Sequence, residues 1–444
     1  MGDSNHLTAT AAAAAIARGE LTAEQLTRDC LDRIEVRDDE VRAWAFLDPE
    51  HALAQAREAD AVLAAGPGTG PLHGVPVGIK DIIDTGDMPT EHGSPLFRGD
   101  RPERDAACVA ALRDAGAVIL GKTVTTELAN ICPGKTRNPH DIRHTPGGSS
   151  SGSAAGVADF QMPLALGTQT GGSVIRPASF CGIYGLKPSL GFIARTGVLL
   201  QSHTLDTVGV YGRSLEDIAL IAGCLSARDP EDPVSYPRSR ADLLQMLSEP
   251  PPRPPRFAFL RTPAWEEHGE PRARDAILDV VTRLGDHCAE ASLPPPFDDI
   301  LELHRTVMGS ENLAYYGDWL DRSPELLSDL LRARLESGRD IRARDYVRAL
   351  NARETIYRDL VALLANHDAV ICLASAGPAP EGFDTTGTPV FNGLWTLLGV
   401  PCVTLPRLTL DGLPMGVQLV GRRGDEGRLL RTAGWLDRWL EEPD

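Results

Sequence analysis

The chain has 444 residues, with 44 Lys and Arg against 62 Asp and Glu, which gives a formal net charge of −18. Its hydrophobic content of 42% and charged content of 24% are those of a globular protein and exclude disorder for most of the chain. Its scattered arginines form no basic stripe of the kind that binds nucleic acid, and no apolar run approaches the ~20 residues that span a bilayer.

The termini and the cysteines predict a cytoplasmic protein. The first residues, MGDSNH, carry neither the basic nor the apolar segment of a secretory signal. Eight dispersed cysteines show no CxxC pair and no Cys/His pairing at metal spacing. We therefore expect reduced, mostly buried thiols, with no metal and no cofactor.

Lysine is rare, because only four of the 44 basic residues are lysines and the rest are arginines. Genome composition explains this bias, but arginine cannot replace lysine as a titratable amine. The four lysines are therefore worth following, and they are Lys80, Lys122, Lys135 and Lys187.

Helices are predicted for the N-terminal segment 1–66. Thr22 and Gln25 form a capping box ahead of an apolar-periodic stretch, and a second helix is expected over 52–65. These helices either cover a sheet or mediate a homodimer, and the sequence leaves both open.

The segment 71–213 has the pattern of an α/β protein, with a helix over 104–116 that leads into a strand. Helices dominate from 271 to 366, after a proline-rich connector. Strands at both ends of the sequence predict one sheet built from distant segments; they are expected at 75–79, 117–120, 164–166, 208–211, 256–260, 369–373, 400–405 and 416–420, before a final helix at 427–440.

The segment 116–123, GAVILGKT, matches the P-loop pattern GxxxxGK[ST] letter for letter. A P-loop needs a flexible loop between its glycines, whereas Ala-Val-Ile-Leu has the composition of a buried strand. We expect a strand here, and a nucleotide-binding P-loop protein is the alternative of a different class.

The segment 148–152, GSSSG, formally matches the GxSxG nucleophile elbow. That elbow follows a strand, but the preceding segment 141–146 is polar and ends in proline. The eleven histidines also show no triad order. A Ser-His-Asp esterase with Ser150 as its nucleophile is therefore the alternative within the hydrolases.

Four further blocks occur together: GVPVGIKD at 74–81, GGSSSGSAA at 147–155, GTQTGGSVIRP at 167–177 and CGIYGLKP at 181–188. In their order, and in the spacing from Ser149 to Ser173, they resemble the amidase signature family. The resemblance is dense over 71–213, looser over 365–425 and weak over 230–350.

The resemblance implies the amidase signature fold: one α/β domain, 1–444, whose mixed, twisted central sheet is covered by helices on both faces. Within it we expect the helical segment 1–66, a signature core at 71–213, a variable helical region at 230–366 that shapes the substrate pocket, and a segment at 367–444 that completes the sheet and ends in a helix. Tyr315, Tyr316 and Trp319 are expected to line that pocket.

The resemblance also implies a Ser-cisSer-Lys triad that hydrolyses a C–N bond other than a peptide bond. Ser173 is the expected nucleophile and forms an acyl-enzyme, Ser149 relays protons after a cis peptide, and Lys80 is the base. The N–H groups of Thr170, Gly171 and Gly172 are the implied oxyanion hole. Burial at the end of an apolar run would lower the pKa of Lys80 as a base requires. Periodicity alone favours a surface lysine paired with Asp81 or Asp84 at position 80, and only the joint pattern of the blocks reverses this interpretation.

Two residues near the nucleophile bear on the substrate. Gln169 stands where many family members have Asp, and Arg176 lies three residues after Ser173. Members that act on small carboxylated amides use such an arginine on the substrate carboxylate, and the structural alternative is an arginine held by buried carboxylates or carbonyls. The expected substrate is a small linear amide, an aryl amide or a carbamate; the alternative is a small amide-carboxylate of malonamidase-like or carboxybiuret type bound by Arg176.

Overall fold

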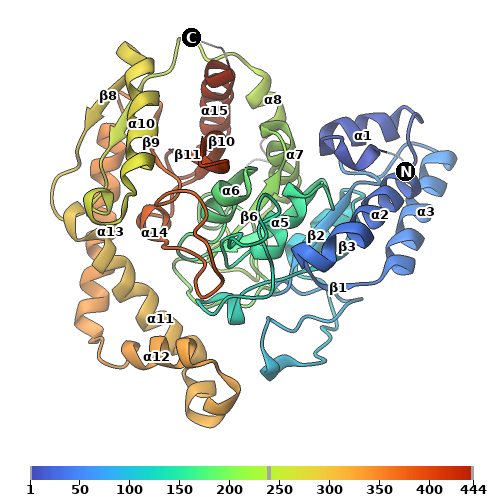
Figure 1. Ribbon diagram of the computed structural model, residues 1–444, viewed down its shortest axis with the longest axis horizontal. Coiled ribbons are helices and arrows are strands. Elements are labelled where there is room, and N and C mark those ends of the chain that lie inside the picture. Colours follow the sequence, from blue (N-terminus) through green and yellow to red (C-terminus); the bar gives the residue numbers. More distant parts are fainter. Residues whose placement is uncertain (1–2, 238–241, 442–444) are drawn as a thin grey trace.

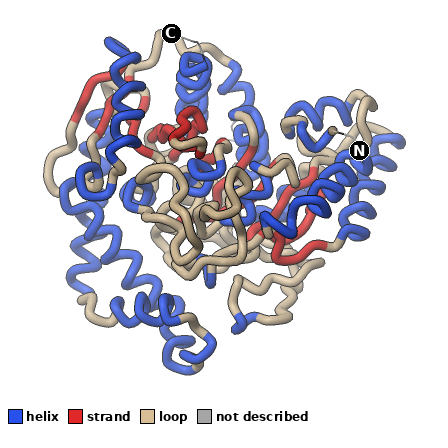
Figure 2. Tube along the Cα trace, in the orientation of Figure 1, coloured by secondary structure: helices blue, strands red, loops and turns tan. Residues whose placement is uncertain are grey.

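An 11-stranded mixed sheet runs through the middle of the protein (Figures 1 and 2). The computed structural model describes residues 3–237 and 242–441, and the outer ends of the predicted terminal segments and a short part of the predicted variable region lie outside the described residues. In sheet order the strands are β1 (Trp44–Leu47), β3 (Val118–Thr123), β2 (Pro76–Lys80), β4 (Leu164–Gln169), β6 (Thr207–Gly212), β5 (Tyr184–Lys187), β10 (Cys402–Leu410), β11 (Leu413–Val420), β9 (Ala369–Leu373), β7 (Phe257–Leu260) and β8 (Cys288–Ala291).

The sheet joins distant parts of the chain, which confirms the prediction from the strand pattern. Strands β3, β2 and β4 are parallel to one another, as are β9, β7 and β8, and the other pairings are antiparallel. The two halves meet where β5 pairs with β10, with Lys187 opposite Cys402. All eight predicted strands are present, and three strands were not predicted. Of these, β1 and β8 are short, partly exposed edge strands, and β5 is a four-residue strand within a signature block.

Helices cover both faces of the sheet, as expected. Along β7 the side chains alternate: Phe257 and Phe259 pack with α10 and α15, whereas Ala258 and Leu260 pack with α11 and α13. The helices are α1 (Ala9–Ala17), α2 (Ala23–Val41), α3 (Pro49–Ala65), α4 (Ala107–Asp114), α5 (Ser151–Ala158), α6 (Ile175–Cys181), α7 (Leu215–Leu225), α8 (Leu243–Ser248), α9 (Trp265–His268), α10 (Pro271–Leu284), α11 (Ile300–Arg322), α12 (Asp329–Gly338), α13 (Ala343–Leu363), α14 (Val390–Leu397) and α15 (Glu426–Glu441).

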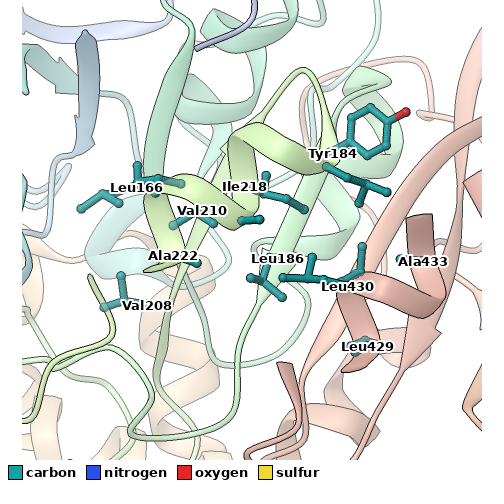
Figure 3. Packing of buried hydrophobic residues seen from close by; sticks show 14 of the residues in the cluster. Leu166, Tyr184, Leu186, Val208, Val210, Ile218, Ala222, Leu429, Leu430 and Ala433 are labelled. Carbon is teal, nitrogen blue, oxygen red and sulfur yellow. The ribbon is translucent and has the colours of Figure 1, made fainter. Parts of the chain in front are cut away.

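The largest buried cluster lies between the sheet and the helices α7 and α15. Figure 3 shows side chains of β4, β5 and β6 meeting those of the two helices. The labelled members of the cluster are Leu166, Tyr184, Leu186, Val208, Val210, Ile218, Ala222, Leu429, Leu430 and Ala433.

The N-terminal helices cover the sheet. Leu26 and Ile34 of α2 pack with Leu120 of β3 in one buried cluster. The capping box is half correct: the Thr22 hydroxyl accepts from the backbone N–H of Gln25, whose side chain donates to Asp29. Within the described residues, none of the helices has the length and apolar character needed to cross a membrane. The homodimer stays a prediction.

The P-loop alternative is wrong. Its last six positions form the fully buried strand β3, so the segment forms no phosphate-binding loop. Lys122 is buried and donates to the carbonyl of Ile83 and the hydroxyl of Thr90, beside Asp81. Thr123 hydrogen-bonds Ser153. The lysine and the hydroxyl that a nucleotide would need are therefore both used in packing the sheet.

Candidate active site

Lys80 is the last residue of β2 and is fully buried. Its Nζ lies 2.6 Å from Ser149 Oγ and 2.8 Å from Thr168 Oγ1 on the neighbouring strand β4. Burial lowers the pKa of Lys80 well below its ordinary value, and the negative charge of Asp206 opposes this only in part. Lys80 is therefore suited to be a neutral amine that takes a proton from Ser149.

Ser149 lies in the turn that leads into α5, after a cis peptide bond between Gly148 and Ser149. A Cβ at Gly148 would lie 2.6 Å from a methyl group of Thr386, so only glycine fits there. The turn is hydrogen-bonded to the helix that follows Ser173, because Arg176 Nη2 donates to the carbonyl of Gly148 at 2.6 Å. The turn at 148–149 and the helix α6, which are distant in the sequence, are thus joined next to Lys80.

Ser173 stands in the turn that leads from β4 into α6. It lines a cavity of about 540 Å³ together with Thr170, Gly171 and Gly172. Its carbonyl accepts from the hydroxyl of Tyr211, which fixes its backbone. The predicted nucleophile and the predicted oxyanion residues therefore share one wall of a cavity large enough for a small molecule.

Two hydrogen bonds fix the peptide planes of this turn. His304 Nε2 donates to the carbonyl of Thr170 at 3.1 Å, and the Thr396 hydroxyl donates to the carbonyl of Gly171 at 2.9 Å. In a trans peptide the N–H points opposite to the carbonyl. The N–H groups of Gly171 and Gly172 are therefore held in fixed directions, as an oxyanion hole requires.

His304 is a site residue that the sequence did not reveal. It comes from α11, in the region of weakest resemblance, and lines the cavity. Burial lowers the pKa of His304 to about 4, so the ring is neutral near pH 7. Because Nε2 donates to Thr170, the proton is on Nε2 and Nδ1 is an acceptor. Spacing could not identify this histidine, since it acts through a backbone carbonyl and belongs to no triad.

Asp206 is a second residue that sequence reasoning missed. Its carboxylate accepts from the hydroxyl of Thr170 and from the backbone N–H groups of Gln201 (2.7 Å) and Ser202 (2.9 Å). Burial raises the pKa of Asp206 to about 6. The carboxylate anchors the side chain of Thr170 while His304 holds its carbonyl.

Gln169 does not line the cavity. Its Oε1 accepts from the backbone N–H groups of Val174 (2.8 Å) and Ile175 (3.0 Å), and its Nε2 donates to Thr396. The side chain therefore caps the start of α6. In place of the predicted substrate contact, the structure shows Gln169 positioning the turn that carries Ser173.

Arg176 lines the cavity and is buried, with 4% of its surface exposed. Its Nη2 donates to Gly148 and, at 3.1 Å, to the Thr386 hydroxyl, while Nε and Nη1 have no hydrogen-bond partner among the described residues. Among the described residues, no carboxylate forms an ion pair with Arg176. Of the two structural partners expected for this arginine, buried carbonyls and buried carboxylates, only a carbonyl is present. Burial without a counter-charge lowers the pKa of Arg176 to about 10, and the guanidinium is still charged at neutral pH.

The esterase alternative is wrong. Ser150 is fully buried, and its hydroxyl both accepts from the N–H and donates to the carbonyl of Thr168. No strand enters the turn before it, and no histidine of the described residues hydrogen-bonds it. Ser150 thus joins α5 to β4.

The prediction that Tyr315, Tyr316 and Trp319 line the pocket is wrong, although other residues of the same helix, α11, do line it. Tyr316 is buried and donates to the carbonyl of Leu128, Trp319 packs on Phe97, and Tyr315 is exposed on the surface. The cavity is instead lined by an earlier part of α11. Tyr316 and Trp319 belong to a separate apolar cluster, and the lining residues of α11 are Leu301, His304, Arg305 and Met308.

The eight cysteines all lie in the described part of the chain and are free thiols. In residues 3–237 and 242–441, no three His, Cys, Asp or Glu side chains are grouped so that they would hold a metal ion.

Comparisons with known proteins give a consistent result. Residues 25–430 match the family model described as Amidase. The A subunit of the glutamyl-tRNA(Gln) amidotransferase of Chloroflexus aurantiacus is 34% identical over 483 aligned positions, which cover 99% of this chain and 98% of that protein. The corresponding protein of Acidothermus cellulolyticus is also 34% identical, with 100% and 96% covered.

Solved structures show the same architecture. The peptide amidase of Stenotrophomonas maltophilia is 30% identical with a TM-score of 0.85, and 99% of this chain and 98% of that chain are covered. A chain of a vestigial protein complex that reveals the evolutionary origins of an s-triazine catabolic enzyme is 28% identical, with a TM-score of 0.91 and 98% of both chains covered. The chain therefore belongs to the amidase signature family and is a hydrolase of C–N bonds.

Proposed function

We propose that the protein hydrolyses the C–N bond of a small linear amide, aryl amide or carbamate through an acyl-enzyme on Ser173. The observation that carries the proposal is the 2.6 Å contact between Lys80 Nζ and Ser149 Oγ at a fully buried lysine. A neutral amine with a hydroxyl partner can accept a proton, and Ser149 can pass on a proton taken from Ser173.

Ser173 Oγ attacks the carbonyl carbon of the substrate, and its proton moves through Ser149 to Lys80. The oxyanion that forms is stabilised by backbone N–H groups at Thr170, Gly171 and Gly172. The peptide planes that carry the Gly171 and Gly172 N–H groups are held by His304 and Thr396. When the C–N bond breaks, the proton returns through Ser149 to the leaving nitrogen. A water molecule then gives its proton through Ser149 to Lys80 and attacks the acyl carbon. As the bond from the acyl carbon to Ser173 Oγ breaks, this proton returns through Ser149 to Ser173, which releases the acid and restores the serine and the neutral amine.

Labelling with a fluorophosphonate tests the nucleophile, because the reagent is attacked by an activated serine. We expect the adduct on Ser173 by peptide mass spectrometry, with the label lost in Ser173→Ala. The buried Ser150→Ala variant is the matched control and should label normally. An adduct on Ser150 in the parent protein would exclude the proposed mechanism.

Arg176 favours an amide-carboxylate as a second candidate substrate. A buried guanidinium without a counter-charge beside the cavity attracts an anion, and two of its nitrogens have no partner among the described residues. The test compares primary amides, anilides, carbamates and short amide-carboxylates in the parent and in Arg176→Ala. Selective loss on the carboxylated substrates supports this role, whereas equal loss on all substrates assigns Arg176 to the hold on Gly148.

A further inference from the structure

A smaller cavity lies beside the active-site cavity and shares a wall with it. Its volume is about 10 Å³, which is the space of one water molecule. Ala129, Thr170 and Gln201 line both cavities. We call the smaller one the inner cavity. Its polar lining residues are all buried, and they are Thr168, Thr170, Arg195, Gln201, Asp206 and Thr207.

Two polar groups of this lining have hydrogen-bonding capacity left. A carboxylate accepts about four hydrogen bonds, and Asp206 accepts three, from the Thr170 hydroxyl and from the backbone N–H groups at 201–202. The Thr168 hydroxyl accepts from Lys80 Nζ, and among the described residues its own hydrogen meets no acceptor. A buried water needs two to four polar partners, and this acceptor and this donor supply two of them.

Other charged and titratable groups near the inner cavity do not take the place of Asp206. Arg195 also lines the inner cavity, but its guanidinium is paired with the carboxylate of Asp232 at 3.1 Å. Tyr315 and Tyr316 of α11 lie close enough for their phenols to sense the charge of Asp206. Burial raises the pKa of both phenols, so they are neutral in the pH range where an amine acts as a base.

The carboxylate of Asp206 lies within reach of the charge that Lys80 acquires when it takes a proton. Thr168 Oγ1 is 2.8 Å from Lys80 Nζ, and two hydrogen bonds through a water add about 3 Å each. The two charges are then at most about 9 Å apart, and each shifts the pKa of the other by roughly one pH unit. Lys122, on the neighbouring strand β3, is occupied by its own ion pair with Asp81.

We propose that the inner cavity binds one water molecule between Thr168 Oγ1 and the carboxylate of Asp206, and that Asp206 acts through this water as the counter-charge of the Lys80 ammonium. The inference rests on the proposed amide hydrolysis and deepens it, because Lys80 becomes an ammonium each time it takes the proton of Ser149. The water donates to Asp206 and accepts from Thr168, and no proton passes along it. The proton on Lys80 returns through Ser149, so Asp206 is a positioning residue.

Lysine NMR tests the coupling without depending on turnover. The chain has four lysines, so protein isotope-labelled at the lysine Cε atoms gives four signals, and Lys80→Met identifies the signal of Lys80. Asp206→Asn removes the charge, yet its amide keeps an oxygen for the backbone N–H groups and a nitrogen that donates to the hydroxyl of Thr170. We expect the pKa of Lys80 to fall by about one pH unit in Asp206→Asn.

The same variant should change the pH profile of a small primary amide. The acid limb of kcat/KM, where Lys80 loses its proton, should move to lower pH by about one unit, and kcat should fall about 3- to 10-fold because Lys80 is then a weaker base. Glu311→Gln is the matched control. Glu311 is a buried carboxylate that holds the same loop at Ser202 and Thr204 but does not line the inner cavity, so its loss should move neither the limb nor the pKa of Lys80.

A crystal structure of the parent protein tests the water site and requires no variant to fold. One ordered water within hydrogen-bond distance of Thr168 Oγ1 and Asp206 is expected. Its absence, or a metal ion at that place, would overturn the proposal. So would a Lys80 pKa that is unchanged in Asp206→Asn or falls equally in Glu311→Gln, even where amides are hydrolysed. If the water is present and the pKa falls but no amide is hydrolysed, the site stands and the proposed reaction fails.

Discussion

Replacing Lys80 by methionine should make the free energy of unfolding rise less steeply with pH in the alkaline range. Lys80 is fully buried, and among the described residues its hydrogen-bond partners are two hydroxyls and no carboxylate. Its pKa in the folded state is well below the ordinary value, whereas in the unfolded chain it returns to about 10.4. Between these two pKa values folding therefore expels a proton, and methionine removes this cost.

The sign follows from the protons bound in each state. Between the folded and unfolded pKa values the unfolded chain binds one more proton, so the stability of the parent rises with pH. The slope is about 1.36 kcal/mol per pH unit well below the unfolded pKa. From pH 8.5 to 9.5 the free energy of unfolding of the parent should gain about 1.3 kcal/mol relative to Lys80→Met.

Urea unfolding of both proteins at pH 8.5, 9.0 and 9.5 measures this difference, and other titrating groups cancel in it. Lys135→Met, at an exposed lysine, is the matched control and should show no such slope. A flat difference between the parent and Lys80→Met would mean that Lys80 keeps its proton on folding, and the argument for a lysine base would fail.

Three further substitutions follow from the same site. Lys80→Arg should fold, as circular dichroism would show, yet abolish turnover, because a guanidinium cannot accept a proton near neutrality; measurable turnover would remove Lys80 as the base. His304→Gln should lower kcat about 10-fold with little change in KM and no change in the pH profile above pH 5, since the ring is already neutral there; a change confined to KM would instead indicate a substrate contact. Gly172→Ala places a methyl group 2.5 Å from Asn392 Oδ1. We expect kcat to fall at least 10-fold and the protein to lose about 1–3 kcal/mol of stability, measured by thermal unfolding. An unchanged kcat would mean that the close packing of this turn is not needed for the reaction.

The sequence predicted the sheet better than the cavity, and the reason is physical. Strand β2 and its neighbours are continuous apolar runs, and such runs have few alternatives to burial between helices. Lys80, Ser149 and Ser173 could be proposed as a triad from the sequence because they occur within dense blocks of small residues. Short edge strands such as β1 carry no comparable pattern.

The cavity wall was harder to predict because its residues act singly. In the sequence, the aromatic residues grouped on α11 predict the lining of a pocket. In the structure, Tyr316 and Trp319 instead pack in an apolar core with Leu128. His304, three turns earlier on the same helix, has no sequence neighbour that marks it. Its role depends on a hydrogen bond to Thr170, 134 positions away, which only the folded chain reveals.

The three buried lysines differ in the hydrogen-bond partners of their amines. Lys187 donates to the carbonyls of Pro188 and Val400, and Lys122 donates to a carbonyl and a hydroxyl beside Asp81. Carbonyl and carboxylate oxygens can only accept, so they favour the protonated amine. Among the described residues, Lys80 alone of the three has only hydroxyl partners, which can donate as well as accept and therefore suit the neutral amine. Burial lowers the pKa of all three lysines, so the nature of their partners is what favours Lys80 for the proposed role of base.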